Sequence, residues 1–234
     1  MENGEKSAPA VVLLHGSSSN AAMWAMDVRV LSQKYRVFTV DIIGECGKSS
    51  EQRPSYHGNG FSDWMNEVFE GLDSKKGSLV GCSSGGWIAA DFAIKHPEKV
   101  ENLVLMATAG ISPVRISTLL LIISMSVFGT PGFNRLNRLV YGNLEIDKHA
   151  LEFAELVRKH YKPRTDALPI FTDEQLRGIE APVLFIGGEK DCFYHSSKTA
   201  MRLARCVKDF RADVLENTGH VLLNQANKIG SFIA

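Results

Sequence analysis

Strand-like runs alternate with helical segments along most of the chain. Six short runs rich in apolar residues each end in a polar or glycine-containing turn, and they cover residues 9–14, 37–40, 78–80, 103–106, 182–186 and 212–215. Between two of these runs, apolar side chains recur at the spacing of one helix face, at Phe61, Trp64, Met65, Val68 and Leu72. Strands that alternate with helices predict an α/β fold, a mostly parallel twisted sheet with helices on both faces.

A serine between two glycines directly follows the run at 78–80. Residues 81–85 have the sequence GCSSG, which matches the G-x-S-x-G nucleophile elbow. A serine on so sharp a strand-to-helix turn has a strained backbone, and its close neighbours must lack bulk, as Gly81 and Gly85 do. Ser84 is a rival nucleophile, but a frame shifted by one residue puts Cys82 where the first glycine is needed. We therefore predict Ser83 as the nucleophile.

An acid and a histidine follow in that order, each after its own strand-like run. Asp191 comes after the run at 182–186 and a Gly-Gly turn, whereas residues 106–110, after an earlier strand, offer no carboxylate. His220 follows the run at 212–215 and a glycine, and we expect an apolar helix to start directly after it. His195 is a rival base, but it lies only four positions from Asp191 and is expected to reach Ser83 less well.

An elbow serine followed by an acid and then a histidine resembles the α/β-hydrolase superfamily. The resemblance runs from Pro9 nearly to the end of the chain and is closest to small serine carboxylesterases with a helical cap. It implies an α/β-hydrolase fold in which Ser83, Asp191 and His220 form a catalytic triad. It also implies a small-molecule ester substrate and no metal or organic cofactor.

The resemblance extends to the first strand-like run, which ends in His15-Gly16. In the family this loop supplies half of the oxyanion hole, which here implies the backbone N–H groups of Ser17 and Ser84 as donors. His15 is then expected to hold the loop by hydrogen bonding. Because His220 must be neutral to act as a base, we expect activity to fall as the pH drops through about 6 to 7.

Related proteins use the same triad for other reactions, so alternatives stay open. A carbon–carbon bond hydrolase of the same fold is the second enzymatic hypothesis. A ligand-binding signalling module that retains the triad is the third hypothesis, from a different functional class. Epoxide and haloalkane hydrolysis are disfavoured, because those relatives have a carboxylate nucleophile where Ser83 stands.

The strand and helix rhythm stops between residues 111 and 178. The resemblance predicts a helical cap at 111–178 between two parts of the hydrolase core, 1–110 and 179–234. The most apolar stretch, 116–128, is shorter than the roughly 20 residues of a bilayer span, so no membrane span is expected. We interpret it as a cap helix that lines an acyl pocket; a helix packed on the body and a membrane-docking segment are the alternatives. Arg115, Arg135 and Arg138 are candidates for contact with a substrate carboxylate.

Family members usually begin with an antiparallel hairpin, and only eight residues precede Pro9 here. We therefore expect the sheet to lack its first antiparallel strands and to have one edge exposed, or covered by a second copy in a homodimer. We expect the absence of these strands to affect the stability of the fold more than its chemistry, whether the chain is a natural short form or incomplete.

Composition narrows the list of partners. The chain has 234 residues, enough for one α/β domain, with 26 basic and 26 acidic residues and hence no net formal charge. That balance gives no support for a nucleic-acid partner. The four cysteines show no metal-ligand spacing, and the polar N-terminal residues lack the apolar core of a signal peptide, so a reduced, cytoplasmic setting is expected.

Overall fold

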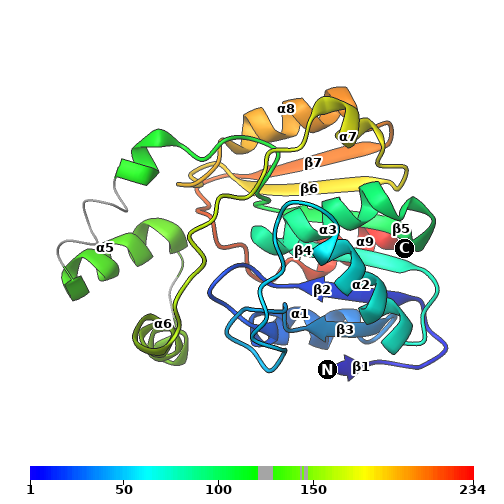
Figure 1. Cartoon of the computed structure of the whole chain (residues 1–234), viewed down its shortest axis with the longest axis horizontal. Helices are drawn as coiled ribbons and strands as arrows, with labels where there is room; N and C mark the ends of the chain where they lie inside the picture. The colour runs from blue at the N-terminus through cyan, green and yellow to red at the C-terminus, as the bar shows by residue number, and fades with distance from the viewer. Residues whose placement is uncertain (121–128, 143, 145–146) are drawn as a thin grey trace.

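The computed structural model describes residues 1–120, 129–142, 144 and 147–234 (Figure 1). Within these residues, seven strands form one sheet in the order β1-β3-β2-β4-β5-β6-β7, and every neighbouring pair except β1 and β3 is parallel. The strands are β1 (Glu2–Asn3), β2 (Ala10–Leu14), β3 (Arg36–Val40), β4 (Gly77–Cys82), β5 (Val100–Met106), β6 (Val183–Gly188) and β7 (Phe210–Leu215). The predicted mostly parallel sheet is confirmed.

Helices cover both faces of the sheet because successive strand residues point to opposite sides. In β4, Leu79 belongs to the core beneath one helical layer, whereas Val80 and Cys82 belong to the core beneath the other. The first layer holds α2 (Gly60–Gly71), α3 (Ser84–Lys95), α7 (Asp173–Arg177) and α8 (Ser196–Cys206); the second holds α1 (Ala25–Leu31) and α9 (Ala226–Ile233) (Figure 1). Two 3-10 turns, η1 (Ala21–Trp24) and η2 (Pro97–Lys99), complete these layers.

Two helices of the 111–178 region, α5 (Gly129–Tyr141) and α6 (Lys148–His160), stand apart from the sheet (Figure 1). The predicted helix at 116–128 falls partly outside the described residues, which omit 121–128. The division into a core and a cap stays a prediction. No helix in the described part of the chain is both long enough and apolar enough to cross a membrane.

One edge of the sheet differs from the prediction. Glu2 and Asn3 pair antiparallel with Phe38 and Val37, so a two-residue antiparallel strand does precede β2. The Arg36 guanidinium, 2.7 Å from the Glu2 carboxylate, also holds β1 against β3. The sequence did not reveal β1 because two polar residues carry no strand pattern.

Candidate active site

The turn from β4 to α3 has the geometry of a nucleophile elbow. Ser83 lies between the two elements with φ 53° and ψ −114°, a conformation that non-glycine residues rarely adopt. A Cβ atom added at Gly81 would lie 2.3 Å from the carbonyl oxygen of Gly85, and one added at Gly85 would lie 2.3 Å from that of His15. The turn therefore requires glycine on both sides of the serine, as the sequence indicated.

The structure brings the three predicted site residues together. His220 Nε2 is 3.1 Å from Ser83 Oγ, and His220 Nδ1 is 2.9 Å from Asp191 Oδ2. Because a carboxylate only accepts hydrogen bonds, Nδ1 carries the proton and Nε2 is left as an acceptor for the serine hydroxyl. Asp191 is fully buried and His220 is 9% exposed. The rival His195 is exposed at the start of α8, and the rival Ser84 is the buried first residue of α3.

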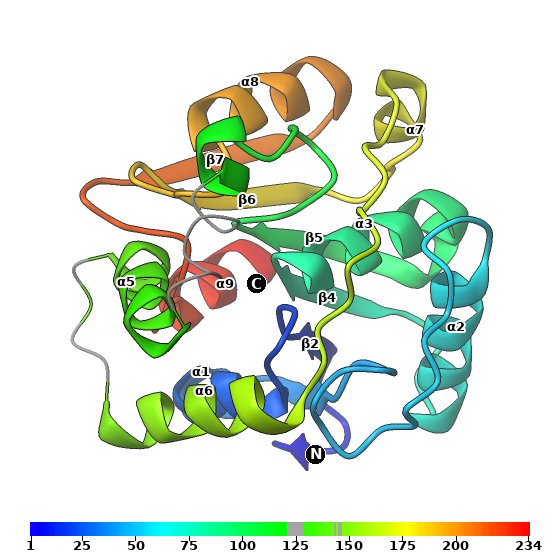
Figure 2. The same ribbon diagram turned by 60° about the vertical axis from the view of Figure 1, so that its left-hand side comes forward.

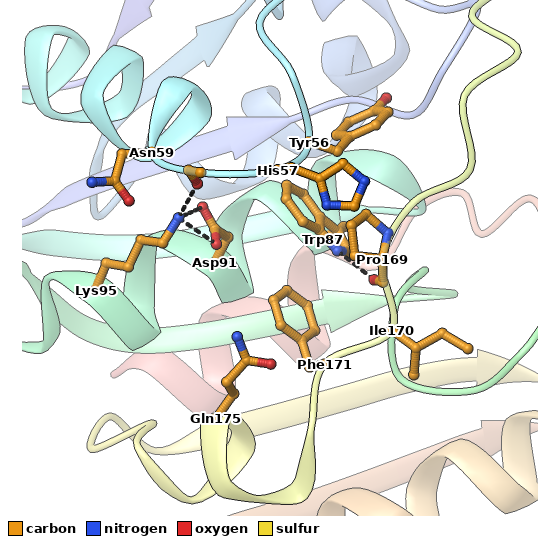
Figure 3. Close-up of a pocket in the computed structure, with 11 residues that line it drawn as sticks. Tyr56, His57, Asn59, Trp87, Asp91, Lys95, Pro169, Ile170, Phe171 and Gln175 are labelled. Atoms are coloured by element: carbon orange, nitrogen blue, oxygen red, sulfur yellow. Dashed lines mark hydrogen bonds and ion pairs between the residues drawn. The ribbon is translucent and has the colours of Figure 1, made fainter.

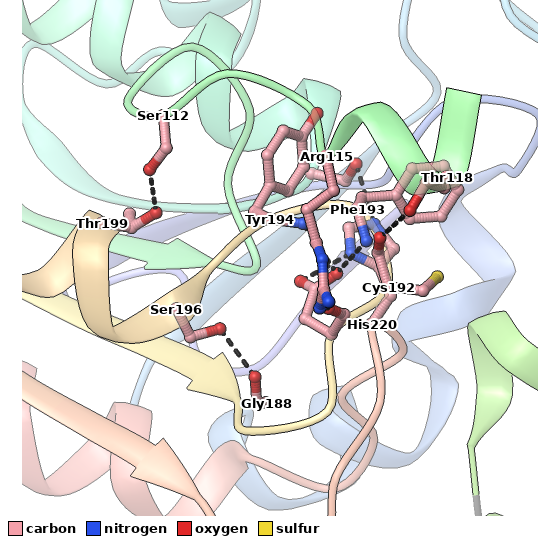
Figure 4. Close-up of polar contacts among 12 residues, drawn as sticks. Ser112, Arg115, Thr118, Gly188, Cys192, Phe193, Tyr194, Ser196, Thr199 and His220 are labelled. Atoms are coloured by element: carbon pink, nitrogen blue, oxygen red, sulfur yellow. Dashed lines mark hydrogen bonds and ion pairs between the residues drawn. The ribbon is translucent and has the colours of Figure 1, made fainter. Parts of the chain in front are cut away.

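The loop after β6 fixes the carboxylate of Asp191. Its Oδ1 accepts hydrogen bonds from the backbone N–H groups of Phe193 (2.7 Å) and Tyr194 (3.2 Å). The rings of these two residues lie against the imidazole of His220, with centroid distances of 4.7 and 5.9 Å (Figure 4). The same short loop therefore orients the acid and packs the histidine. Sequence reasoning missed this role, although two aromatic residues close behind an acid were a visible signal.

The segment at 111–120 packs on the same loop (Figure 4). The guanidinium of Arg115 donates to the backbone carbonyl of Asp191 at 3.0 Å, and the Thr118 hydroxyl donates to that of Cys192. Arg115, a candidate for substrate binding in the sequence, thus holds the acid loop in the structure. Arg135 and Arg138 are exposed on α5.

The end of α5 holds the histidine loop. The backbone N–H of His220 donates to the carbonyl of Val140 at 3.0 Å, and Gly142 forms an isolated β-bridge with Thr218. The sequence predicted a helix directly after His220, but residues 221–225 are not helical and α9 begins at Ala226. That prediction was wrong: the backbone N–H groups of His220 and of the next residue both donate to the carbonyl of Val140, and residues 221–225 form a loop beside the end of α5.

The loop after β2 is held by His15, as predicted. Its Nε2 accepts from the backbone N–H of Ile42 at 2.9 Å, so Nδ1 carries the proton and donates to the carbonyl of Gly16 at 2.7 Å. Burial lowers the pKa of His15, which keeps the ring neutral and preserves this pattern.

This loop runs next to the elbow. A Cβ atom added at Gly16 would lie 3.4 Å from Ser83 Cβ. Among the hydrogen bonds of the described residues, the backbone N–H groups of Ser17 and Ser84 have no protein acceptor. Ser84 also lies at the N-terminus of α3, where the helix dipole favours negative charge. Both groups are therefore available to an anionic oxygen.

The thiol beside the nucleophile does not compete with it. Cys82 is buried on the α1 and α9 side of the sheet, and burial raises the pKa of its thiol to about 12. Burial likewise raises the pKa of Cys192, beside the acid, to about 11. Both thiols are therefore protonated near neutral pH, and a neutral thiol is a poor nucleophile.

A cavity of about 280 Å³ lies beside α3 but is not lined by the triad residues (Figure 3). Some of its polar groups are paired: the Lys95 ammonium contacts the Asp91 carboxylate at 2.9 Å, and the Trp87 indole donates to the carbonyl of Pro169 at 2.9 Å. This cavity is therefore separate from the three predicted site residues.

Comparisons with known proteins identify relatives that share this sequence pattern and fold. The sequence is 29% identical over 229 residues to the carboxylesterase YbfK of Bacillus subtilis, covering 94% of this chain and 77% of that protein. The crystal structure of that enzyme superposes with a TM-score of 0.86 at 28% identity, covering 100% of this chain and 86% of the other. The naproxen esterase of B. subtilis superposes with a TM-score of 0.87 at 26% identity, with the same coverage.

A more distant structure shares the fold alone. The meta-cleavage product hydrolase CumD of Pseudomonas fluorescens superposes with a TM-score of 0.78 at 23% identity, covering 100% of this chain and 90% of the other. The family model described as the alpha/beta hydrolase fold matches residues 9–159, more than half of the chain. With a parallel sheet that presents an elbow serine, this chain belongs to the α/β-hydrolase fold family.

Proposed function

We propose that the protein is a serine hydrolase that cleaves carboxylic esters through Ser83, His220 and Asp191. The observation that carries this proposal is the continuous relay from the serine hydroxyl through the imidazole to the buried carboxylate, with distances of 3.1 and 2.9 Å. The carboxylesterase names of the two Bacillus relatives support an ester as the substrate class.

The proposed reaction proceeds through an acyl-enzyme. Ser83 Oγ attacks the ester carbonyl carbon while His220 Nε2 takes its proton, and Asp191 stabilises the imidazolium that forms. The backbone N–H groups of Ser17 and Ser84 hold the oxyanion. The imidazolium returns the proton to the departing alkoxide as the tetrahedral intermediate collapses. Water, with its proton taken by His220, then attacks the acyl-enzyme and releases the acid and free Ser83.

The test combines labelling by a fluorophosphonate probe with a series of p-nitrophenyl esters of increasing chain length. We expect Ser83→Ala to abolish labelling and to lower turnover by on the order of 10⁶-fold, and Asp191→Asn to lower turnover by roughly 10⁴-fold. Ser84→Ala keeps its backbone N–H and should still be labelled, which separates the two serines. A Ser83→Ala enzyme with a tenth of the wild-type activity would remove Ser83 as the nucleophile.

A carbon–carbon bond hydrolase is the second candidate, because CumD, named as a meta-cleavage product hydrolase, shares the fold. Saturable cleavage of a vinylogous dienoic acid without turnover of short-chain esters would favour it. A signalling module that keeps the triad would instead give a single slow turnover with trapped product and ligand-dependent binding of another protein.

A reduced cytoplasmic setting and a homodimer remain part of the proposal. The four cysteines are free thiols, all within the described residues, which supports a reducing compartment. Residues 1–3 cover most of the edge of β3, since Glu2 and Asn3 pair with Phe38 and Val37 and Met1 exchanges two hydrogen bonds with Thr39, so a second copy would pair along the short outer edge of β1. Size-exclusion chromatography with light scattering measures the oligomeric state.

A further inference from the structure

A buried carboxylate outside the relay lies against the loop of the proposed oxyanion hole. Glu45, in the loop after β3, is 9% exposed. Its Oε2 accepts from the backbone N–H of Ser18 at 2.8 Å, and its Oε1 accepts from the hydroxyl of Ser17 at 3.1 Å. The proposed reaction has no chemical task for this side chain.

These two contacts hold the residue of a proposed oxyanion donor, Ser17, through its side chain and through the peptide N–H that follows it. Ser18 has a left-handed backbone with φ 58°, a conformation that is costly for a residue other than glycine unless its surroundings enforce it. The charge-assisted bond from its N–H to Glu45 stabilises that conformation. Since the N–H of Ser17 belongs to the preceding peptide unit, its direction depends on this turn.

The same carboxylate also reaches the 111–178 region. The hydroxyl of Tyr161, the residue after α6, donates to Glu45 Oε2 at 2.8 Å and lies 3.2 Å from the carbonyl oxygen of Gly44. The Arg53 guanidinium lies 5.2 Å from the centre of the Tyr161 ring and donates to the carbonyl of Lys162 at 2.6 Å. Figure 2 shows the chain that leaves α6 passing beside the loop after β3. Burial, and next the bond to Glu45, raise the pKa of Tyr161, so its hydroxyl remains a donor.

We propose that Glu45 is a positioning residue. It couples the position of the Tyr161 side chain to the geometry of the oxyanion hole. This inference rests on the proposed function above. A carboxylate near a developing oxyanion repels it, so Glu45 acts through the geometry of the Ser17–Ser18 turn and not through its charge. Tyr161 supplies a third hydrogen bond to the carboxylate and thereby ties the segment after α6 to that turn.

The experiment compares Glu45→Ala, Glu45→Gln, Tyr161→Phe and the double variant Glu45→Ala/Tyr161→Phe on p-nitrophenyl butyrate. Loss of a correctly aimed oxyanion donor lowers kcat, so we expect about a 100-fold loss in Glu45→Ala and about a 5-fold loss in Tyr161→Phe, with KM within about twofold. Glu45→Gln keeps an acceptor for Ser18 and should restore kcat to within about tenfold of wild type. Tyr161→Phe should add nothing in the Glu45→Ala background.

A second readout does not depend on catalysis. Amide hydrogen exchange of residues 15–19 should accelerate in Glu45→Ala and, to a smaller extent, in Tyr161→Phe. Tyr35→Phe is the matched control, because it also loses a tyrosine hydrogen bond, to the carbonyl of Gly230 in α9 at 3.1 Å. It should leave both kcat and this exchange unchanged.

The outcomes separate the two proposals. A wild-type protein without ester turnover or fluorophosphonate labelling refutes the proposed function, and the exchange data then decide the coupling by themselves. An active wild type whose Glu45→Ala and Tyr161→Phe variants keep both kcat and loop exchange refutes the coupling alone. A double variant whose fold-loss in kcat is the product of the two single-variant losses would also overturn it.

Discussion

Single residues in this site depend on backbone conformations that the surrounding chain enforces. Ser83 and Ser18 both have positive φ values, of 53° and 58°, and each such residue costs on the order of 1 to 3 kcal/mol. The first turn is possible because Gly81 and Gly85 approach closely, and it is held by the bond from the N–H of Ser83 to the carbonyl of Met106 at 2.9 Å. The carboxylate of Glu45 holds the second turn. The reactive geometry is thus maintained by neighbours that take no part in the proposed chemistry.

His15 gives a pH prediction at this scale. Its pKa is lowered in the folded state, so the unfolded chain binds a proton as the pH falls below about 6.5 while the folded chain does not. The free energy of unfolding therefore decreases from about pH 6.5 down to the lower pKa of the folded state. His15→Gln removes this contribution, so the stability difference between wild type and variant should shrink over that window in urea titrations.

A His15→Gln difference that stays constant or grows on acidification would contradict the neutral, hydrogen-bonded state assigned to His15.

The sequence could identify the site residues that belong to a local pattern, but not those defined by contacts with distant parts of the chain. Ser83 was identifiable because the elbow imposes a local pattern of glycines, and Asp191 and His220 because each follows its own strand. Glu45 and Val140 were not identifiable, because their partners Tyr161 and His220 lie 116 and 80 positions away, and no local pattern encodes such contacts.

At the scale of elements, the acid loop after β6 and the histidine loop after β7 are packed directly on each other. A Cβ atom added at Gly188, the last residue of β6, would lie 2.1 Å from the carbonyl oxygen of Gly219, next to His220. The hydroxyl of Ser196 in α8 also donates to the carbonyl of Gly188 at 2.7 Å (Figure 4). The C-terminal end of β6 therefore has little freedom to move away from the histidine loop.

Gly188→Ala should consequently displace the histidine loop. A shift of about 1 Å in the imidazole lowers kcat by on the order of 100-fold, since the relay needs its hydrogen-bond distances. Steady-state kinetics and the rate of fluorophosphonate labelling measure the loss. Gly71→Ala at the end of α2 is the matched control, because no neighbouring atom lies within 4 Å of the added methyl group. Normal labelling of Gly188→Ala would show that the two loops move apart freely.

The elements themselves were predictable to different degrees. The strands from β2 to β7 were predicted to within three residues at each end, because buried parallel strands are short apolar runs between turns. β1 was missed because its two residues form a strand only through pairing with β3. The helix expected right after His220 starts only at Ala226, and the loop before it has backbone contacts to α5 that local patterns do not contain.

At the scale of the molecule, hydrogen bonds join the last helix, α9, to segments near the start of the chain. The carboxylate of Asp27 in α1 accepts from the backbone N–H of Ala226 at the start of α9, at 2.8 Å across 199 positions. The hydroxyl of Tyr35 donates to the carbonyl of Gly230 in the same helix. Because α9 begins six residues after His220, the docking of this last helix limits the movement of the histidine loop.

Ile229→Ala tests whether the core and the site form one cooperative unit. Ile229 is fully buried in α9, so removal of its side chain should lower the free energy of unfolding by about 3 kcal/mol. If α9, the sheet and the relay unfold together, helical circular dichroism and fluorophosphonate labelling will be lost at one common urea midpoint, lower than in wild type. Met201→Ala, which truncates a side chain that is 60% exposed, should leave the midpoint nearly unchanged. Loss of labelling well before the loss of circular dichroism would instead mean that α9 and the histidine loop detach while the sheet stays folded.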